Sequence, residues 1–246
     1  MLLEGKVILV TGVAKGGIGE AVVQYYSAHN QIIVNSRTMV DGRIADAHLA
    51  IAADCTTTEG VNKLEQEVRK QFGTIDVLVN CVGGSLGSYP FQDLTSHFVE
   101  QVFRVNLTSS LLLSQMADRL MAGGGSICHI VSSSAFEPEV TKLPYAMAKA
   151  GQVHLIRSLA KILAPKNIIV NGVSPTYVFT DRHLDELQKE ADEKGTTVDE
   201  AHHDQTKKQL IQEKLFPADL LPFIDLALST RFMTGKVIHA TAGRVL

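Results

Sequence analysis

The sequence predicts an α/β protein in which about seven parallel strands form one sheet with helices on both faces. Three observations predict this fold class. Apolar runs of strand length alternate with segments of helical spacing along the 246 residues. The strand-like runs are almost continuously apolar, which is typical of strands covered on both faces. The first run ends in a glycine-rich turn that leads into a helical segment.

The expected strands are short apolar runs, most of them ending at a polar residue or a glycine. They are KVILVTG at 6–12, QIIVNSR at 31–37, HLAIAAD at 48–54, IDVLVN at 75–80, GSICHIVS at 125–132, NIIVNGVSP at 167–175 and KVIHA at 236–240. The helical patterns cover 20–30, 58–72, 95–122 and the stretch from Tyr145 to about Leu163. Strands joined through helices run parallel, so these elements predict a doubly wound sheet.

The charge balance argues against two classes of partner. Charged residues make up 20% of the chain and the formal net charge is −3. That balance gives no reason to expect binding to nucleic acid or to an anionic membrane surface. The expected partner is a small molecule.

The cysteines and the apolar runs indicate where the protein works. Cys55, Cys81 and Cys128 have no CxxC spacing, so we expect free thiols and neither disulfides nor a metal site. No apolar run reaches the roughly 18–20 residues that a membrane span needs, and no signal peptide is visible. These features predict a soluble cytoplasmic protein.

One segment, 181–214, departs from the composition of the rest. It is densely charged, with Leu184, Leu187 and Ala191 at helical spacing, and Thr197 and Glu200 form a plausible capping box. It is either a mobile lid over a site or a solvated surface excursion. No linker or repeat divides the chain, so residues 1–246 are expected to form a single domain.

The turn TGVAKGGIGE after the first strand indicates a phosphate site. Gly12, Gly16, Gly17 and Gly19 lie between a strand and a helix, where backbone amides can face a pyrophosphate. The alternative is an ordinary glycine turn between a strand and a helix. The surrounding strand and helix favour the dinucleotide site.

The end of the second strand indicates which dinucleotide. An NAD site usually has Asp or Glu there, whereas this chain has Ser36 and Arg37, with Lys15 in the glycine turn. Two cations suit a 2′-phosphate, so NADP(H) is the expected cofactor and NAD(H) stays open. The alternative is that Arg37 merely caps the edge of the sheet.

The stretch PYAMAKAG places Tyr145 and Lys149 on one face of a helix. A phenol with a pKa of about 10 is a poor base at neutral pH, and a nearby ammonium would lower that pKa. Ser132, thirteen positions upstream, ends the fifth strand, where its hydroxyl could polarise a substrate oxygen. The alternative is a half-buried tyrosine with a lysine reaching into solvent.

These residues make the chain resemble the short-chain dehydrogenase/reductase family nearly end to end. The resemblance implies a Rossmann-like fold, hydride transfer with nicotinamide, and a dimer or tetramer. Ser132, Tyr145, Lys149 and Asn106 match the family's catalytic positions, Asn106 through a water relay to the lysine. The implied cofactor-binding positions are Gly12, Lys15, Gly17, Ile18, Gly19, Ser36, Arg37, Asp54, Cys55, Asn80, Val82, Gly83, Tyr145, Lys149, Pro175, Val178 and Thr180.

The chain departs from the family pattern at three places. The glycine loop is one residue longer, Cys81 and Val82 replace Asn-Ala, and Thr176 replaces a glycine. None of these changes removes a group that does chemistry. They affect the fine placement of the cofactor.

The expected activity is an NADP(H)-dependent oxidoreductase of a ketone or secondary alcohol, with 3-oxoacyl and polyketide carbonyls among the candidates. An enoyl-thioester reductase is the enzymatic alternative, but that branch separates its Tyr and Lys by six residues and this chain has three. A non-catalytic dinucleotide sensor or scaffold is the other alternative. The substrate wall is expected at 84–95, 134–143 and 181–214.

Two histidine-containing stretches are expected to carry no chemistry. His202-His203-Asp204 lacks spaced partners for a metal and is expected on a solvated face. His129, in the fifth strand, is expected to be packed or hydrogen-bonded.

Overall fold

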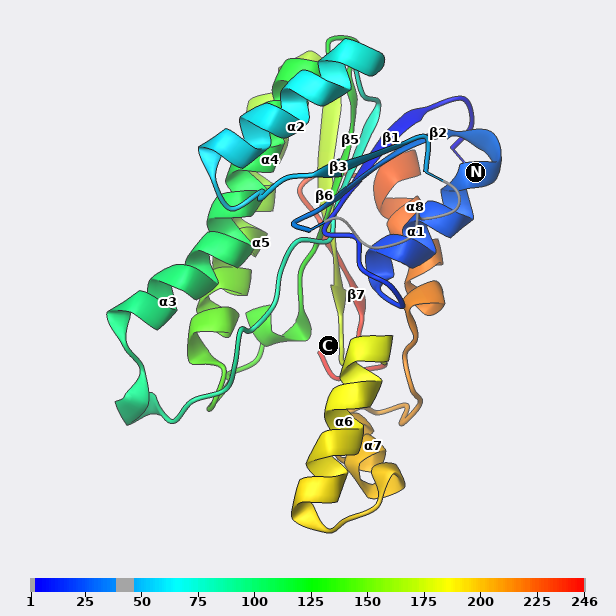
Figure 1. Cartoon of the computed structure of the whole chain (residues 1–246). Helices are drawn as coiled ribbons and strands as arrows, with labels where there is room; N and C mark the ends of the chain where they lie inside the picture. Colours follow the sequence, from blue (N-terminus) through cyan, green and yellow to red (C-terminus); the bar gives the residue numbers. More distant parts are fainter. Residues whose placement is uncertain (1–2, 39–46, 246) are drawn as a thin grey trace.

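The computed structural model describes residues 3–38 and 47–245. Within them, seven strands form one parallel sheet in the order β3-β2-β1-β4-β5-β6-β7 (Figure 1). The strands are β1 Val7–Thr11, β2 Gln31–Ser36, β3 Leu49–Ala52, β4 Val77–Asn80, β5 Gly125–Ile130, β6 Ile168–Pro175 and β7 Val237–Ala240. The predicted fold class is therefore confirmed, with most strands a residue or two shorter at their ends than expected.

The helices follow the expected order along the chain. They are α1 Ile18–Tyr26, α2 Thr58–Gln71, α3 Ser96–Phe103, α4 Ser109–Leu120, α5 Leu143–Leu163, α6 Asp181–Lys194, α7 Val198–Thr206 and α8 Leu221–Ser229. The helix expected at 95–122 is not continuous, because a π-helical turn, Arg104–Thr108, separates α3 from α4. Asn106 lies in that turn and its amide donates to the Val102 carbonyl at 2.8 Å.

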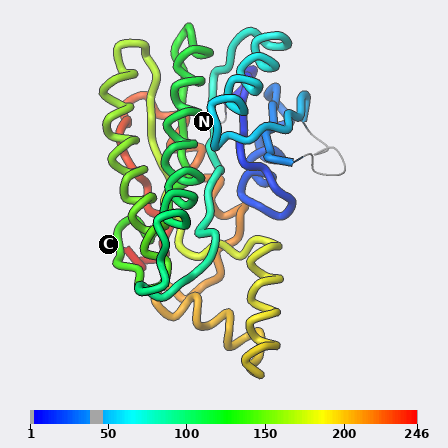
Figure 2. Tube along the Cα trace, turned by 60° about the vertical axis from the view of Figure 1, so that its left-hand side comes forward, coloured from blue at the N-terminus to red at the C-terminus, as the bar shows by residue number. Residues whose placement is uncertain are grey.

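Two apolar layers hold the helices against the sheet. On one face α2, α4 and α5 pack on alternate strand residues such as Leu9 and Ile33. On the other face α1 and α8 pack on the intervening residues, among them Ile8 and Ile32. Figures 1 and 2 show the sheet between these two groups of helices. This layering leaves the carboxyl ends of the strands open for polar residues.

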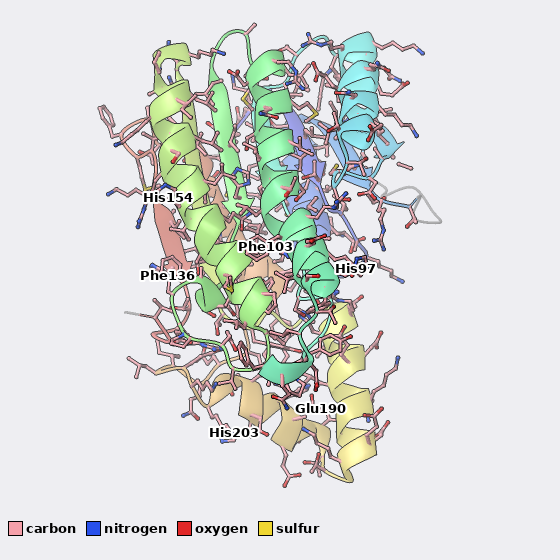
Figure 3. The ribbon with its side chains drawn as sticks, turned by 90° about the vertical axis from the view of Figure 1, so that its left-hand side faces the viewer. His97, Phe103, Phe136, His154, Glu190 and His203 are labelled. Atoms are coloured by element: carbon pink, nitrogen blue, oxygen red, sulfur yellow. The ribbon has the colours of Figure 1, made fainter. Side chains whose placement is uncertain are left out.

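Helices α6 and α7 form a separate pair beyond the carboxyl ends of the strands (Figure 1). Their own small core contains Phe179, Leu187, Ala191 and Ala201. Figure 3 shows Glu190 and His203 on this pair. The segment is therefore a packed helical hairpin and not simply a solvated excursion, while its movement over a site stays a prediction.

The predicted capping box at the start of α7 is present. The Thr197 amide donates to the Glu200 carboxylate at 2.9 Å, and the Glu200 amide donates to the Thr197 hydroxyl at 3.2 Å. The solvated face expected for His202 is only partly present, because His202 is half-buried and its ring packs edge-on against Phe179 with centroids 5.3 Å apart. His203 is exposed as expected.

The glycine turn is held tightly against the loop that follows β4. Gly12 has a φ of +73°, and a Cβ there would lie 2.6 Å from the Val82 backbone nitrogen. Gly19 is also confined, because its Cβ would lie 3.1 Å from the Val13 α-carbon. The turn therefore needs glycine at position 12 for both conformation and space.

Replacing Gly12 by alanine tests this confinement. We expect Gly12→Ala to lower the free energy of unfolding by about 3 kcal/mol, roughly 1 from the left-handed backbone and roughly 2 from the clash. Gly73→Ala is the matched control, because Gly73 has a φ of +74° and a Cβ there would have nothing within 4 Å. Urea denaturation of both variants makes the comparison, and equal losses would contradict the close approach of the two loops.

Candidate active site

The four predicted catalytic residues come from three neighbouring elements. Ser132 follows β5, Tyr145 and Lys149 lie in the first turns of α5, and Asn106 lies in the π-helical turn before α4. Since α5 packs on both the segment after β5 and the π-helical turn, these residues share one end of the sheet. Figure 3 shows α5 running alongside α4, with Phe136 of the adjoining loop labelled.

Ser132 lies beside the phenol of Tyr145. Its hydroxyl oxygen accepts a hydrogen bond from the Ser134 amide at 3.2 Å, and its interaction with Tyr145 favours the phenolate. Ser133 is buried, and the Ser134 hydroxyl donates to Glu139 at 2.9 Å. Of these three serines, Ser132 is the one that acts on Tyr145.

The pKa of Tyr145 is raised in the structure. Burial is the main cause, Glu139 adds to it, and the hydrogen bond with Ser132 and the charge of Arg182 act in the opposite direction. The expected lowering by Lys149 is therefore not the net result in the protein alone. Partial burial of the phenol disfavours its charged form more than Ser132 and Arg182 favour it.

Lys149 is buried with a cluster of carbonyl acceptors. Its amine donates to the Ile130 carbonyl at 2.8 Å and to the Gln152 side-chain oxygen at 3.0 Å, and it lies 5.8 Å from the centre of the Tyr145 ring. Only 3% of the residue is exposed. Burial lowers the pKa of this lysine to about 7, with Cys81 acting to raise it. The alternative of a lysine reaching into solvent is wrong.

The loop after β4 touches this amine. A Cβ on Gly83 would lie 3.1 Å from the Lys149 amine and 2.9 Å from the Asn106 side-chain oxygen. Because Gly12 packs against Val82 in the same loop, a continuous line of contacts joins the glycine turn to Lys149.

The side-chain amide of Asn106 holds that loop through both its nitrogen and its oxygen. Its nitrogen donates to the carbonyls of Gly84 and Val102, both at 2.8 Å, and its oxygen accepts from the Gly84 amide at 3.0 Å. Two opposed hydrogen bonds to one residue fix the position of the loop. The water relay that the family resemblance implies for Asn106 stays a prediction.

The start of α1 has the features of an anion site. Gly17 is the N-cap of α1 and supplies no side chain to its amides, while Ile18 and Gly19 form the first turn. Amides at a helix N-terminus favour a negative group. Lys15 is exposed on the turn, and the Gly16 amide donates to Glu20 at 2.7 Å.

The predicted adenosine-binding residues lie at the ends of β2 and β3. Arg37 is exposed, and the Ser36 hydroxyl donates to the Thr38 carbonyl. Asp54 is half-buried and accepts from the Thr56 amide at 2.9 Å. Cys55 points into the core, where it donates to Asn35 at 3.0 Å and burial raises the pKa of its thiol to about 12. Only the backbone of Cys55 is therefore available to a ligand.

Most of the residues predicted to lie beside the nicotinamide have backbone or side-chain partners within the protein. Asn80 is buried, and its oxygen accepts from the Thr11 hydroxyl and the Val82 amide, both at 3.0 Å. Pro175 ends β6, Val178 pairs with Leu215, and Thr180 caps α6 by accepting from the His183 amide at 3.3 Å. Asn80, Val178 and Thr180 thus shape the site through the backbone they fix.

A buried polar network behind Lys149 was missed by the sequence reasoning. Ser110 joins Asn80 and Gln152, accepting from their amides at 3.1 and 2.8 Å. His129 lies between Asn80 and Ser114, at 3.1 and 3.2 Å, so it is packed and hydrogen-bonded as expected. The available signal was a set of polar residues at helical spacing inside otherwise apolar helices.

Comparison with known proteins identifies the arrangement. The family model described as short chain dehydrogenase matches residues 6–191. The chain belongs to the short-chain dehydrogenase family. It is an oxidoreductase that uses NAD(P)(H) and acts on alcohol or carbonyl groups.

Several members of this family are similar over nearly the whole chain. Glucose and ribitol dehydrogenase homolog 2 of Arabidopsis thaliana is 30% identical, covering 99% of this chain and 87% of that protein. The 3-oxoacyl-(acyl-carrier-protein) reductase of Aquifex aeolicus is 30% identical, covering 98% of both. The structure of L-sorbose reductase from Gluconobacter frateurii has a TM-score of 0.92 at 22% identity, covering 99% of this chain and 98% of that one.

Residues 3–38 and 47–245 contain neither a membrane span nor a metal cluster. No helix there is long and apolar enough to cross a membrane. No group of three His, Cys, Asp or Glu residues there could hold a metal ion.

His129 provides a test of the buried network. Burial lowers its pKa to about 3 from an ordinary 6.5, so between these values the unfolded chain binds a proton that the folded chain does not. The contribution of His129 to the free energy of unfolding is therefore fully present above pH 6.5 and is lost as the pH falls toward 3. The total loss is roughly 2–5 kcal/mol.

We expect His129→Asn to flatten this part of the curve of unfolding free energy against pH. The same change at the exposed His154 is the control and should leave the curve unaltered. Denaturant titrations from pH 4 to 8 measure both, and an unchanged slope in His129→Asn would contradict a neutral, buried imidazole.

Proposed function

We propose that the protein is an NADP(H)-dependent carbonyl reductase that converts a ketone to a secondary alcohol. The observation that supports this most directly is the contact line from Gly12 through Val82 and Gly83 to Lys149. It joins the predicted phosphate-binding turn to the Ser132–Tyr145–Lys149 group at one end of the sheet. A dinucleotide lying along this line would reach the three side chains that handle a substrate oxygen.

The residues fit a nicotinamide dinucleotide. Gly12 and Gly83 let the glycine turn, the loop after β4 and the Lys149 amine lie close together, and Gly17 leaves the amides of α1 without a side-chain cap. When bound, the cofactor supplies the hydride. The Ser132 hydroxyl and the Tyr145 phenol would then both direct hydrogens at the substrate oxygen, where negative charge develops.

The direction of proton transfer follows from the environment of Tyr145. Its raised pKa keeps the phenol protonated at neutral pH, which suits a general acid that gives its proton to a reduced carbonyl oxygen. The resulting phenolate would be stabilised by the Lys149 ammonium 5.8 Å from the ring centre. In the reverse direction, a cationic nicotinamide would help to lower the same pKa.

Preference for NADP(H) is supported by the end of β2. Ser36 and Arg37 stand where an acidic residue would repel a 2′-phosphate, and Arg37 is exposed and able to turn toward it. Lys15 lies on the neighbouring glycine turn. Two cations and a hydroxyl match the charge and hydrogen-bonding capacity of a phosphate.

The predicted substrate wall is polar, and two of its carboxylates, on Glu137 and Glu139, are already paired. Arg244 binds Glu137 at 2.6 Å and Glu139 at 3.5 Å, tying the C-terminal segment to the loop after β5. Phe136 packs against the His239 ring with centroids 4.5 Å apart. This pairing favours a neutral polar substrate, so ketoses and 3-oxoacyl or polyketide carbonyls are the first classes to examine.

Three sequence expectations stay predictions. They are the homo-oligomeric assembly, the cytoplasmic location and the movement of α6 and α7 as a lid. The free state of all three cysteines agrees with a reducing compartment.

Removing the Tyr145 hydroxyl tests the catalytic role. We expect Tyr145→Phe to lower kcat by at least about 100-fold, because the proton donor is lost. NADPH absorbance is followed against a panel of ketoses, 3-oxoacyl thioesters and other ketones. Tyr25→Phe, at a half-exposed tyrosine of α1, is the control. Undiminished turnover by Tyr145→Phe would refute the assignment, and no turnover by the wild type on the whole panel would favour a non-catalytic dinucleotide sensor.

The cofactor preference has its own test. Arg37→Asp should lower the ratio of kcat/KM for NADPH to that for NADH by about tenfold or more. The reason is that one charge-assisted hydrogen bond to the 2′-phosphate is lost and the new carboxylate repels that phosphate. Arg157→Asp, at an exposed position of α5, controls for the change in net charge. An unaltered ratio would remove Arg37 from the cofactor site.

A further inference from the structure

We propose that Gln152 is a positioning residue for the reaction, because its amide oxygen fixes the direction of the Lys149 amine beside Tyr145. This role rests on the proposed function, in which Lys149 serves Tyr145. Gln152 lies one helical turn beyond Lys149 on α5 and is fully buried. An amide at such a position needs partners for all its polar atoms.

The geometry of Lys149 shows what Gln152 contributes. An ammonium has three N–H donors. One goes to the Ile130 carbonyl of β5 at 2.8 Å and one to the Gln152 oxygen at 3.0 Å. With two donors fixed, the third is confined to the remaining direction. Gly83 borders that amine, with 3.1 Å between the Lys149 nitrogen and a Cβ placed on the glycine.

The orientation of the Gln152 amide is set by Ser110. The Ser110 hydroxyl donates its single hydrogen to the Asn106 carbonyl at 2.8 Å. It can therefore only accept from Gln152, which presents its nitrogen to Ser110 at 2.8 Å. The Gln152 oxygen must then face Lys149. The same serine accepts from Asn80 at 3.1 Å, which ties this orientation to β4.

Lys149 meets a neutral acceptor, the Gln152 oxygen, and not a carboxylate. Burial already lowers the pKa of Lys149 to about 7. The titratable groups that face it are Cys81, which raises that pKa, Tyr145 on its own helix, and His129, whose pKa is itself low at about 3. The Gln152 oxygen favours the ammonium form without the full attraction of a carboxylate.

Two substitutions with opposite electrical effects test the role. Gln152→Leu removes the acceptor, whereas Gln152→Glu supplies a carboxylate at the same distance along the side chain. The protonation midpoint of Lys149 is measured by NMR from its ε-carbon shift in ¹³C-lysine-labelled protein, assigned with Lys149→Met. The pH profile of kcat for ketone reduction is measured in parallel. Gln115→Leu, at an exposed position of α4, is the control.

We expect Gln152→Leu to lower the Lys149 midpoint by about one pH unit and kcat by about tenfold, with the ketone KM within about twofold of wild type. Gln152→Glu should move the midpoint in the opposite direction. If Gln152 only filled space, the Lys149 protonation midpoint would be the same as wild type in both variants. Midpoints within about 0.3 pH unit of wild type in both variants, or shifts of the same sign, would overturn the role.

Two provisions keep the test decisive. Should Gln152→Leu fail to fold, Gln152→Asn withdraws the oxygen from the amine while keeping an amide, and it is expected to lower the midpoint in the same direction. Should the wild type reduce no carbonyl, the proposed function fails by itself. The NMR midpoints then decide whether Gln152 positions Lys149.

Discussion

The burial of one amine, on Lys149, is the constraint on which the rest of the site depends. A lysine removed from water needs hydrogen-bond acceptors, and the structure provides two, the Ile130 carbonyl of β5 and the Gln152 oxygen of α5. Asn106, Ser110 and Gly83 each lie close to this amine or to one of its partners. The polar interior between α4, α5 and the sheet is thus organised around a single charge.

Much of the fold could be predicted because its signals are local. Alternation of apolar runs with helical spacing gave the order of strands and helices, and the glycine turn identified the carboxyl edge as the site. The prediction of Ser132 also agrees with the geometry, since of three adjacent serines it is the one that acts on Tyr145. The Thr197–Glu200 capping box was visible for the same reason, as a four-residue pattern.

The energetics of the site could not be predicted, because they depend on three-dimensional surroundings. The sequence shows that Tyr145 and Lys149 share a helix face, but not that burial outweighs the nearby charges at the phenol. It shows a polar residue at 152, but not that Ser110 dictates which end of its amide meets Lys149. The break at Arg104–Thr108 likewise depends on a side chain of Asn106 competing for backbone groups, which periodicity does not reveal.

The attachment of the helical hairpin formed by α6 and α7 restricts how it can move. At its start, Val178 pairs with Leu215, which lies just after the hairpin. At its end, Gln209 accepts from the Thr176 hydroxyl at 3.2 Å and donates to the carbonyls of Ile211 and Glu213. Both ends are therefore tethered near the tip of β6, so the predicted movement of the hairpin would turn about that tip and displace the distant bend around Gly195 the most.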